Sequence, residues 1–541
     1  MDFPLYPPWR AKSAITKVPV VIVGGGAVGL TLALALSRRS IDVLILEDDN
    51  RVCDGSRALG MARRTLDIWD YLGIGDRISQ IGVAWVGGRT FFRDKTILQF
   101  SFPIDSGLAN PPLLNIQQSY VEQYLVEAIA KSPGTTIAWQ TRLSNLNQDD
   151  KGVTLEIETQ SGPHTIRADY VVACDGARST VRRICDVQME GTSYSAEYLI
   201  VDIKLNSPSA IERRAWFDPP SGVASTVLMH GQPENIWRID FQLAETENIA
   251  DAMKPDALQQ RVSRHLAAIG EPGHFDLAWA TTYRAHSRVL TDFRAGYIFF
   301  AGDSAHLLPI FGIRGLNSGV EDAFNLAWKL ERALRSPASE RLLGSYSAER
   351  LYAARQNMAL ANRAADFMTP PTRGARLMRD AVLSLAVTDV TVRPLINPRQ
   401  ATFIPLSQSP LNTPPHLLRG EGLQPGDVLP NLALGQTGKA KSFYAGLGNG
   451  FVLVLASDTL PLSEEIYTLL GRYCIEPLVV GTVPAINGSS IPDEDRCIRN
   501  RLGLDGGNTL LVRPDHHIAA WIAPEKPAEL ERAARTAMGL Q

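Results

Sequence analysis

Clustered metal ligands and paired cysteines are scarce in this chain. Its five cysteines lie among 541 residues at positions that form no CxxC pair and no zinc-like spacing: Cys53, Cys174, Cys185, Cys474 and Cys497. Of the nine histidines, only His516 and His517 are adjacent. We therefore expect reduced thiols in a cytoplasmic protein, and we predict no metal site.

Excess charge and a clear export signal are also missing. The net charge is -3, so there is no basic surplus to neutralise nucleic-acid phosphates. The N-terminus, MDFPLYPPWRAK, lacks the charged-then-apolar order of a signal peptide. The apolar run 18–37 is long enough to imitate a membrane span, but its glycines favour a strand that turns into a helix. We expect neither a nucleic-acid nor a membrane partner.

The length of the chain predicts several domains, because single cores rarely grow beyond about 300 residues. Residues 18–50 have a strand–helix–strand pattern, and helical periodicity returns at 61–73 and 118–134. From about 190 to 290 alternate residues are apolar, which predicts a mostly antiparallel sheet interrupted by one helix. Residues 317–385 are again helical.

The C-terminal part follows a proline-rich connector, since eight of the 34 prolines lie between Pro394 and Pro430. Beyond the connector, apolar strands alternate with helical stretches. We therefore divide the chain into an α/β dinucleotide-binding unit, an inserted sheet, the second part of the first unit with helices, a linker and a small α/β unit, at 1–190, 191–290, 291–390, 391–430 and 431–541.

A glycine-rich turn directly follows the first strand. Gly24, Gly26 and Gly29 have GxGxxG spacing, with Ala27 and Val28 between the last two. In such turns the first glycine permits the tight bend, the second lets backbone approach a pyrophosphate, and the third packs helix on strand. Glu47 ends the next strand, where a carboxylate can accept hydrogen bonds from ribose hydroxyls. The pattern predicts a dinucleotide site.

Two further segments accompany this turn, ACDGARS at 173–179 and AGDSAHLLPIFGIRGLNSGVEDAFNLAWKL at 301–330. Together the three segments resemble the signature of class A flavoprotein monooxygenases, the single-component FAD-dependent aromatic hydroxylases. The resemblance covers roughly the first 390 residues. It implies a Rossmann-type FAD-binding domain, an inserted β-sheet substrate domain and a helical region. The last unit, with LVRPDHHIAAWI, resembles the thioredoxin-like C-terminal domain of phenol and 3-(3-hydroxyphenyl)propionate hydroxylase-type enzymes.

The resemblance also implies which residues bind FAD. Asp303 would contact the ribityl or ribose part, and Asp175 would contact FAD and serve NADPH. The helix beginning near Gly315, Leu316 and Asn317 would direct its N-terminus at the flavin pyrimidine edge. Family FAD positions also map onto Arg57 and Gln118.

One position departs from the family pattern at the reactive face of the flavin. Relatives have two prolines or a Pro-Phe pair ahead of the glycine turn, whereas here Pro309 is followed by Ile310. Ile310 offers a backbone carbonyl beside the flavin but lacks the fixed φ of proline. The departure bears on the pose of the substrate.

The implied reaction is hydroxylation of a phenolic or related aromatic compound. NAD(P)H would reduce FAD, O2 would add at flavin C4a, and the resulting hydroperoxide would transfer hydroxyl to the ring. A Baeyer–Villiger or decarboxylative monooxygenase and a catalytically silent flavoprotein scaffold are the alternatives. A homodimer is also compatible with the pattern. Four polar or aromatic residues of the inserted sheet are candidates to contact substrate: Trp237, Arg238, Tyr283 and His286.

Overall fold

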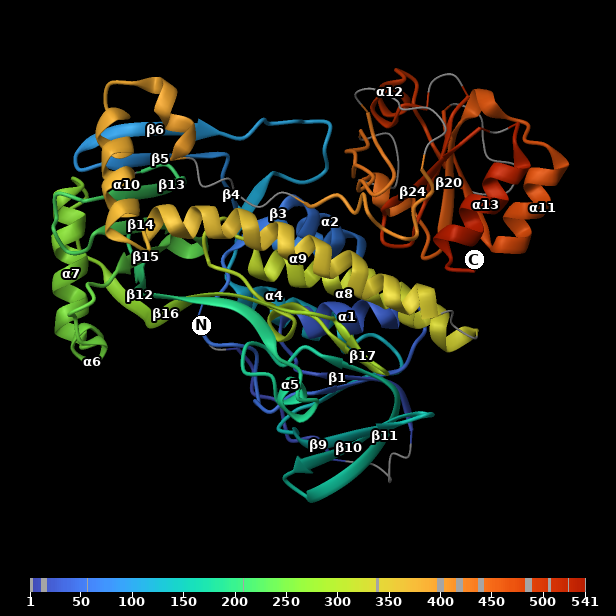
Figure 1. Cartoon of the computed structure of the whole chain (residues 1–541), viewed down its shortest axis with the longest axis horizontal. Coiled ribbons are helices and arrows are strands. Elements are labelled where there is room, and N and C mark those ends of the chain that lie inside the picture. Colours follow the sequence, from blue (N-terminus) through green and yellow to red (C-terminus); the bar gives the residue numbers. More distant parts are fainter. Residues whose placement is uncertain are drawn as a thin grey trace.

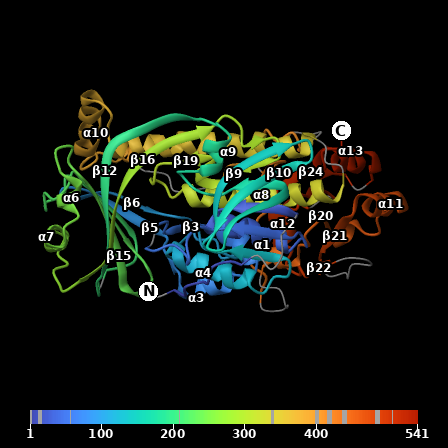
Figure 2. The ribbon, with the colours of Figure 1, turned by 90° about the horizontal axis from the view of Figure 1, so that it is seen from below.

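Three sheets of five or more strands organise the chain. A computed structural model describes residues 3–10, 17–55, 57–207, 209–336, 340–396, 403–414, 422–435, 442–481, 489–504, 507–523 and 525–540. Figures 1 and 2 place the second sheet and the C-terminal unit at opposite ends of a core built on the first sheet and long helices. Two elements of that core are formed by the run 18–37, and no described helix has both the length and the apolarity needed to span a bilayer.

The first sheet has the parallel core that the sequence predicts. Its strands run in the order β17-β18-β11-β1-β2-β8, and β9 and β10 extend β11 as an antiparallel branch. Their bounds are β1 Val18–Val23, β2 Val43–Leu46, β8 Thr135–Ala138, β9 Arg142–Asp149, β10 Gly152–Thr159, β11 Gly162–Ala173, β17 Arg294–Ala295 and β18 Ile298–Phe300. Strand β18 pairs with β11, so chain segments on both sides of the inserted sheet complete this unit.

Helices surround the first sheet (Figure 2). Helix α1 is apolar almost throughout and packs against α4 and α8, which explains the long apolar run. The helices of this unit are α1 Ala27–Ser37, α2 Arg63–Tyr71, α3 Gly75–Ile81, α4 Gln118–Ile129, α5 Thr180–Ile184, α8 Gly315–Arg335 and α9 Glu340–Met368, with the short helix η2 Gly302–Ser304. A small sheet of β3 Gly60–Ala62, β4 Val83–Ala84 and β7 Leu113–Asn115 completes it.

The second sheet is mostly antiparallel, as predicted, but it recruits a hairpin from outside 191–290. Its order is β19-β16-β12-β15-β14-β13-β5-β6. The bounds are β5 Gly87–Phe92, β6 Lys95–Ser101, β12 Met189–Lys204, β13 Arg213–Phe217, β14 Thr226–Gly231, β15 Ile236–Gln242, β16 Asp276–Leu290 and β19 His306–Leu307. Strand β5 pairs in parallel with β13, so assigning all of 1–190 to the first unit was wrong for β5 and β6.

One face of the second sheet is covered by helices. Apolar side chains that include Leu199, Val201 and Ile239 pack with Val262 of the covering helix in one buried cluster. The helices on this side are α6 Ile249–Ala252 and α7 Pro255–Ala268, and η1 Pro233–Asn235 connects β14 to β15. Because side chains alternate along a strand, the residues between these apolar positions point toward the first unit.

The C-terminal unit contains a five-stranded sheet in the order β22-β21-β20-β23-β24. Strands β20 to β22 are parallel and β23–β24 is an antiparallel hairpin, as LVRPDHHIAAWI predicts. Its elements are η4 Phe443–Gly446, β20 Phe451–Ala456, η5 Ser457–Thr459, α11 Glu464–Tyr473, β21 Ile475–Val480, β22 Ser489–Ile491, α12 Cys497–Leu502, β23 Thr509–Val512, β24 Ile518–Ile522 and α13 Pro527–Ala537. This arrangement agrees with the thioredoxin-like expectation. Helix α10 Arg373–Leu385 and η3 Val390–Leu395 lie instead at the second sheet, where Leu383 packs with Phe217 and Leu228 (Figure 1).

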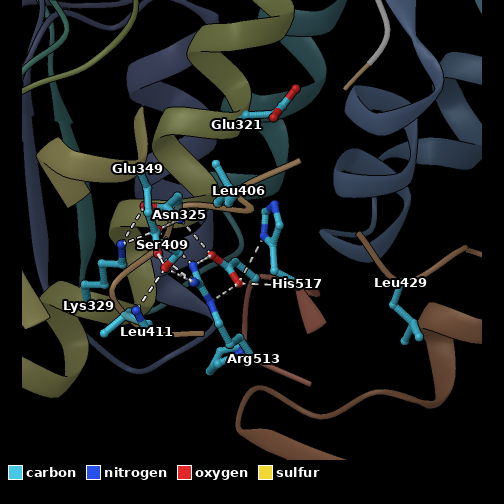
Figure 3. A network of polar contacts seen from close by, with 12 residues as sticks. Glu321, Asn325, Lys329, Glu349, Leu406, Ser409, Leu411, Leu429, Arg513 and His517 are labelled. Carbon is cyan, nitrogen blue, oxygen red and sulfur yellow. Dashed lines mark hydrogen bonds and ion pairs between the residues drawn. The ribbon is translucent and has the colours of Figure 1, made fainter. Parts of the chain in front are cut away.

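Buried charges join this unit to the long helices (Figure 3). Glu349 on α9 accepts hydrogen bonds from Lys329 Nζ on α8 at 2.7 Å and from Arg513 Nη1 at 2.6 Å. Arg513 also binds Asp515 at 2.6 Å, and all four side chains of these pairs are fully buried. Ser409, within the predicted linker, donates a hydrogen bond to Glu349. The described part of the linker therefore packs into this network.

Candidate functional site

A cavity of about 970 Å³ lies between the first unit and the face of the second sheet that is opposite to α7. The ends of α9 and α10 pack on another part of the same face. All three sequence segments reach its wall. Twelve of the residues expected at the cofactor line it, namely Gly24, Gly26, Ala27, Val28, Glu47, Arg57, Gln118, Asp175, Asp303, Gly315, Leu316 and Asn317. Ile310, expected at the reactive face, lines it as well, whereas Pro309 and Gly29 do not.

The glycine turn has the geometry that a pyrophosphate requires. Gly24 has a φ of +108°, and a side chain there would overlap the Cys174 carbonyl. A Cβ at Gly29 would overlap the Gly24 carbonyl, so this glycine packs helix on strand and stays outside the cavity. At Gly26 a Cβ would find its nearest neighbour, Glu122 Oε1, 3.8 Å away. The N-terminus of α1 thus faces open space, where a phosphate can approach.

Glu47 lies at the end of β2 beside this turn. Its Oε2 accepts a hydrogen bond from Gly25 N at 2.6 Å, and its Oε1 accepts one from Asp49 N at 2.9 Å. Burial raises the pKa of Glu47 to about 7. A carboxylate held by two backbone amides is well oriented for ribose hydroxyls that enter the cavity.

Gln118 and Arg57 belong to one loop–helix contact. Gln118 Oε1 accepts a hydrogen bond from Ala58 N at 3.1 Å, and Gln118 Nε2 donates to Glu122 Oε1 at 2.7 Å. Arg57 is exposed, and its carbonyl accepts a hydrogen bond from Arg238 Nη1 at 2.9 Å. The loop that carries Arg57 is thereby tied both to α4 and to the second sheet.

The two aspartates of the later segments have different environments. Asp175 Oδ2 accepts hydrogen bonds from Thr180 N at 2.7 Å and Val181 N at 3.0 Å, so it caps α5, while its Oδ1 has no protein partner. Asp303 projects into the cavity and has no hydrogen bond to any described residue. Desolvation by the surrounding protein raises the pKa of both carboxyls. Asp303 is therefore the freer of the two to bind a ligand hydroxyl.

The start of α8 also opens on the cavity. A Cβ at Gly315 would meet nothing within 4 Å. Asn317 is committed to the protein, because its Oδ1 accepts a hydrogen bond from Ala62 N at 2.9 Å and its Nδ2 donates to the Gly60 carbonyl at 3.0 Å. Arg314 directly precedes the helix, and burial lowers its pKa to about 10. Arg314 therefore adds a positive side chain to the positive end of the α8 dipole, and the sequence did not indicate this residue.

Two of the four candidate substrate residues line the cavity. Arg238 faces it from β15, and Tyr283 faces it from β16, with its hydroxyl 3.5 Å from the Leu308 carbonyl. Trp237 precedes Arg238 by one residue and so points to the covered face, where it is 4% exposed. His286 also lies outside the cavity and is bonded to Ser193 Oγ at 2.9 Å. Trp237 and His286 therefore do not line this cavity.

Three charged or titratable residues on the second-sheet side of the cavity were not predicted from the sequence. They are Arg213 on β13, His230 on β14 and Asp240 on β15. Burial raises the pKa of Asp240 to about 7, although Arg238 acts against it. The sequence shows polar residues at alternate positions of apolar strands, which indicates a polar face. It does not show which strands pair, and that pairing brings these three residues together.

Comparisons with known proteins agree with this geometry. The FAD binding domain family model matches residues 17–361. A 3-(3-hydroxy-phenyl)propionate/3-hydroxycinnamic acid hydroxylase of Mycolicibacterium smegmatis is 31% identical over 68% of this chain, which spans 64% of that relative. The protein of the same name from Mycolicibacterium gilvum is 27% identical over 97% of this chain and 92% of its own length.

Solved structures share the fold. The flavin-dependent monooxygenase PieE, solved with FAD and substrate, is 23% identical with a TM-score of 0.78, over 98% of this chain and 100% of that one. The p-nitrophenol 4-monooxygenase PnpA from Pseudomonas putida is 25% identical with a TM-score of 0.61, over 71% and 97% of the two chains. The first of these similarities extends over the C-terminal unit as well.

Proposed function

Because the chain belongs to the FAD binding domain family, we propose that it is an FAD-dependent monooxygenase that hydroxylates a phenolic or related aromatic substrate with NAD(P)H and O2. One observation carries the proposal. A single cavity runs from the glycine turn and Asp303 to the polar face of the second sheet. Such a cavity can hold a dinucleotide and a small second molecule against it. The names of the two mycobacterial relatives favour a phenol as that molecule.

The protein groups at the cavity fit FAD. Glu47 is placed for the ribose, the N-terminus of α1 for the pyrophosphate, and Asp303 for a ribityl or ribose hydroxyl. The N-terminus of α8 places its free amide groups and the positive end of its dipole at the far end. When bound, FAD supplies the redox and oxygen chemistry.

The residues of the chain orient the aromatic compound and keep water away from it. Ile310 and Phe311 form an apolar wall where the third segment meets the second sheet. Leu228 faces them from β14. The Tyr283 hydroxyl lies at the Leu308 carbonyl, which ties the sheet to that segment. A ring held between these apolar surfaces is shielded from solvent, as an oxygen-transfer reaction needs.

The test is turnover of the purified holoenzyme with NADH or NADPH in the presence and absence of phenols. We expect slow oxidation alone, at least about 10-fold stimulation by the right phenol, and a product heavier by one oxygen atom. A ring-expanded lactone or loss of CO2 would instead indicate Baeyer–Villiger or decarboxylative chemistry. A flavin that no nicotinamide reduces with any phenol would indicate a silent scaffold.

The state of the cofactor gives an independent check. We expect FAD to be bound without a covalent link, so acid denaturation should release it to the supernatant. Flavin that stays with the precipitated chain would contradict this. We also propose a cytoplasmic location, because all five cysteines are free. A homodimer is a further prediction, which light scattering of the holoenzyme tests.

A further inference from the structure

A row of charged side chains crosses the cavity-facing side of the second sheet. Asp202 on β12 pairs with Arg238 on β15, and Arg238 pairs with His230 on β14. Arg213 continues the row on β13, since the register pairs Arg214 with Met229, the residue before His230. Arg213, His230 and Arg238 all line the cavity.

Two of these charges neutralise each other. Arg238 Nε lies 3.0 Å from Asp202 Oδ1, which also accepts a hydrogen bond from Gln232 Nε2 at 3.0 Å. His230 adds no charge, because burial and the neighbouring Arg213 and Arg238 lower its pKa well below the ordinary value. Within this row, the charge of Arg213 is not neutralised, and the acid that acts on Arg213 is Asp240 in the adjoining row.

Arg213 is only 5% exposed, yet its guanidinium makes no hydrogen bond or ion pair with any described residue. Burying an unpaired cation is costly, so such a group normally finds an anion. The next residue shows the usual solution. Arg214 points to the covered face, where it pairs with Glu271 and lies 5.0 Å from the centre of the Trp237 ring. Arg213 is left to face the cavity.

The row beside Arg213 is apolar except for Asp240. Ile200 pairs with Asp240, which pairs with Leu228, and Leu228 pairs with Ala215. Leu228 and Ala215 belong to the cluster that includes Phe311 and Ile310. Positions two residues apart on a strand are about 7 Å apart. An aromatic ring against the apolar row would therefore reach Arg213 through a short substituent.

We propose that Arg213 is the specificity-determining residue that binds a carboxylate on a short side chain of the aromatic substrate. This inference rests on the proposed function and deepens it. The neutral His230 ring offers a hydrogen bond to the same carboxylate. Asp240, whose Oδ1 has no partner, lies in the adjoining row and is available to a substrate hydroxyl. The preferred substrates are thus hydroxyaryl acids rather than neutral phenols.

The experiment measures binding to the holoenzyme by perturbation of the flavin spectrum. The probes are 3-(3-hydroxyphenyl)propionate, its primary amide and 3-ethylphenol, which share the ring but differ in charge. We expect the wild type to prefer the acid over the amide by at least about 10-fold. Arg213→Gln should lose that preference by weakening acid binding about 10- to 100-fold, with amide affinity within about 2-fold.

Two further variants control for charge and folding. Arg213→Lys keeps the cation and should retain a preference for the acid. Arg89→Gln removes an arginine from the neighbouring strand β5 that pairs with Glu212 outside the cavity, so it should leave every affinity unchanged. FAD content of each variant reports correct folding. Equal affinity of the wild type for acid and amide, or an unchanged acid preference in Arg213→Gln, would overturn the role of Arg213.

The readouts separate this inference from the proposed function. Acid-selective binding that depends on Arg213, without stimulated NAD(P)H oxidation by any probe, would support the carboxylate site and contradict the hydroxylase. Stimulated turnover of all three probes alike would support the hydroxylase and overturn the carboxylate site. Phenylphosphonate and benzenesulfonate, added as competitors, test whether the site prefers carboxylate over other anions. Tighter binding of either competitor than of 3-phenylpropionate would also overturn the proposal.

Discussion

Two groups of buried charges in this protein differ in how their charges are paired. Between α8, α9 and the C-terminal unit, Arg513, Asp515, Lys329 and Glu349 pair with one another, and two positive charges balance two negative ones. On the cavity side of the second sheet, Arg213 and Asp240 attract each other, but the Arg213 guanidinium and Asp240 Oδ1 make no hydrogen bond with any described residue. Both groups are shielded from solvent.

The difference shows in the pKa values. Burial raises the pKa of Glu349, but Arg513 and Lys329 outweigh it and hold that pKa well below its ordinary value. In the cavity, burial dominates and raises the pKa of Asp240 to about 7. A network that satisfies its own charges stabilises the fold, whereas unsatisfied groups weaken the empty protein and become useful when a ligand completes them.

Breaking the paired network should produce the largest effect. Arg513→Leu would leave Glu349 and Asp515 buried without their main cation, so we expect a loss of about 3–5 kcal/mol in the free energy of unfolding. Denaturant titration of the holoenzyme measures it. Arg93→Ala, which removes an exposed pair with Asp218, is the control and should cost less than about 1 kcal/mol. Similar small costs for both would mean that the network does not stabilise the fold.

Neutralising Asp240 should instead raise the free energy of unfolding. The folded pKa of about 7 exceeds the unfolded value of about 3.9, so the folded state takes up the extra proton between these values. Stability from this group therefore rises as pH falls from 8 toward 5. Asp240→Asn should be more stable than wild type by about 1–3 kcal/mol at pH 8, and the gain should shrink at pH 5. Thermal unfolding of substrate-free holoenzyme at both pH values measures it.

A stability gain of Asp240→Asn that is the same at both pH values would contradict the pKa assigned to Asp240.

The stability that the paired network contributes should depend on pH in the other direction, because the pKa values of Glu349 and Asp515 are depressed. Their contribution is present above the unfolded pKa of about 4 and is lost at lower pH. Acid unfolding of the wild type should therefore begin below about pH 4.

Asp303 gives the smallest expected change in folding and a clear one in binding. Its carboxylate makes no hydrogen bond with any described residue and desolvation raises its pKa, so Asp303→Ala should not lower the free energy of unfolding of the apoprotein. FAD affinity should fall by about 10- to 150-fold, the value of a hydrogen bond from a hydroxyl to a charged acceptor. Flavin fluorescence on dilution measures it, with Asp94→Ala in the exposed β5–β6 turn as the control. Full retention of FAD would show that the third segment was placed wrongly.

Much of the fold follows from local patterns. The glycine spacing, the alternation between 190 and 290 and the closing hairpin of the C-terminal unit each depend on neighbouring residues, and each element appears where its pattern predicts. The hairpin β5–β6 could not be assigned in the same way. Its parallel pairing with β13 joins residues more than 100 positions apart, and no local pattern records such a partner.

In the site, too, residues that lie together in the sequence could be predicted, and residues that only sheet pairing brings together could not. The cofactor residues come in contiguous segments, so a resemblance could locate them, and Gly24, Glu47 and Asp303 do reach one cavity. The substrate residues come from separate strands. Trp237 and Arg238 are neighbours on one strand, and the sequence does not fix which of them faces the cavity; in the structure Arg238 lines it and Trp237 lies on the covered face. Arg213 and Asp240 meet only through sheet register, which the sequence does not display.

The most direct measurement compares two buried arginines in the same substrate-free holoenzyme. Arg213→Leu and Arg513→Leu remove the same side chain from two buried places, one without a hydrogen bond or ion pair to any described residue and one with both Glu349 and Asp515 as ion-pair partners. We predict that Arg213→Leu keeps or slightly raises the free energy of unfolding, while Arg513→Leu lowers it by about 3–5 kcal/mol. If Arg213→Leu destabilises the protein as much as Arg513→Leu, Arg213 is a structural residue and the contrast between a paired network and a ligand-completed cavity is wrong.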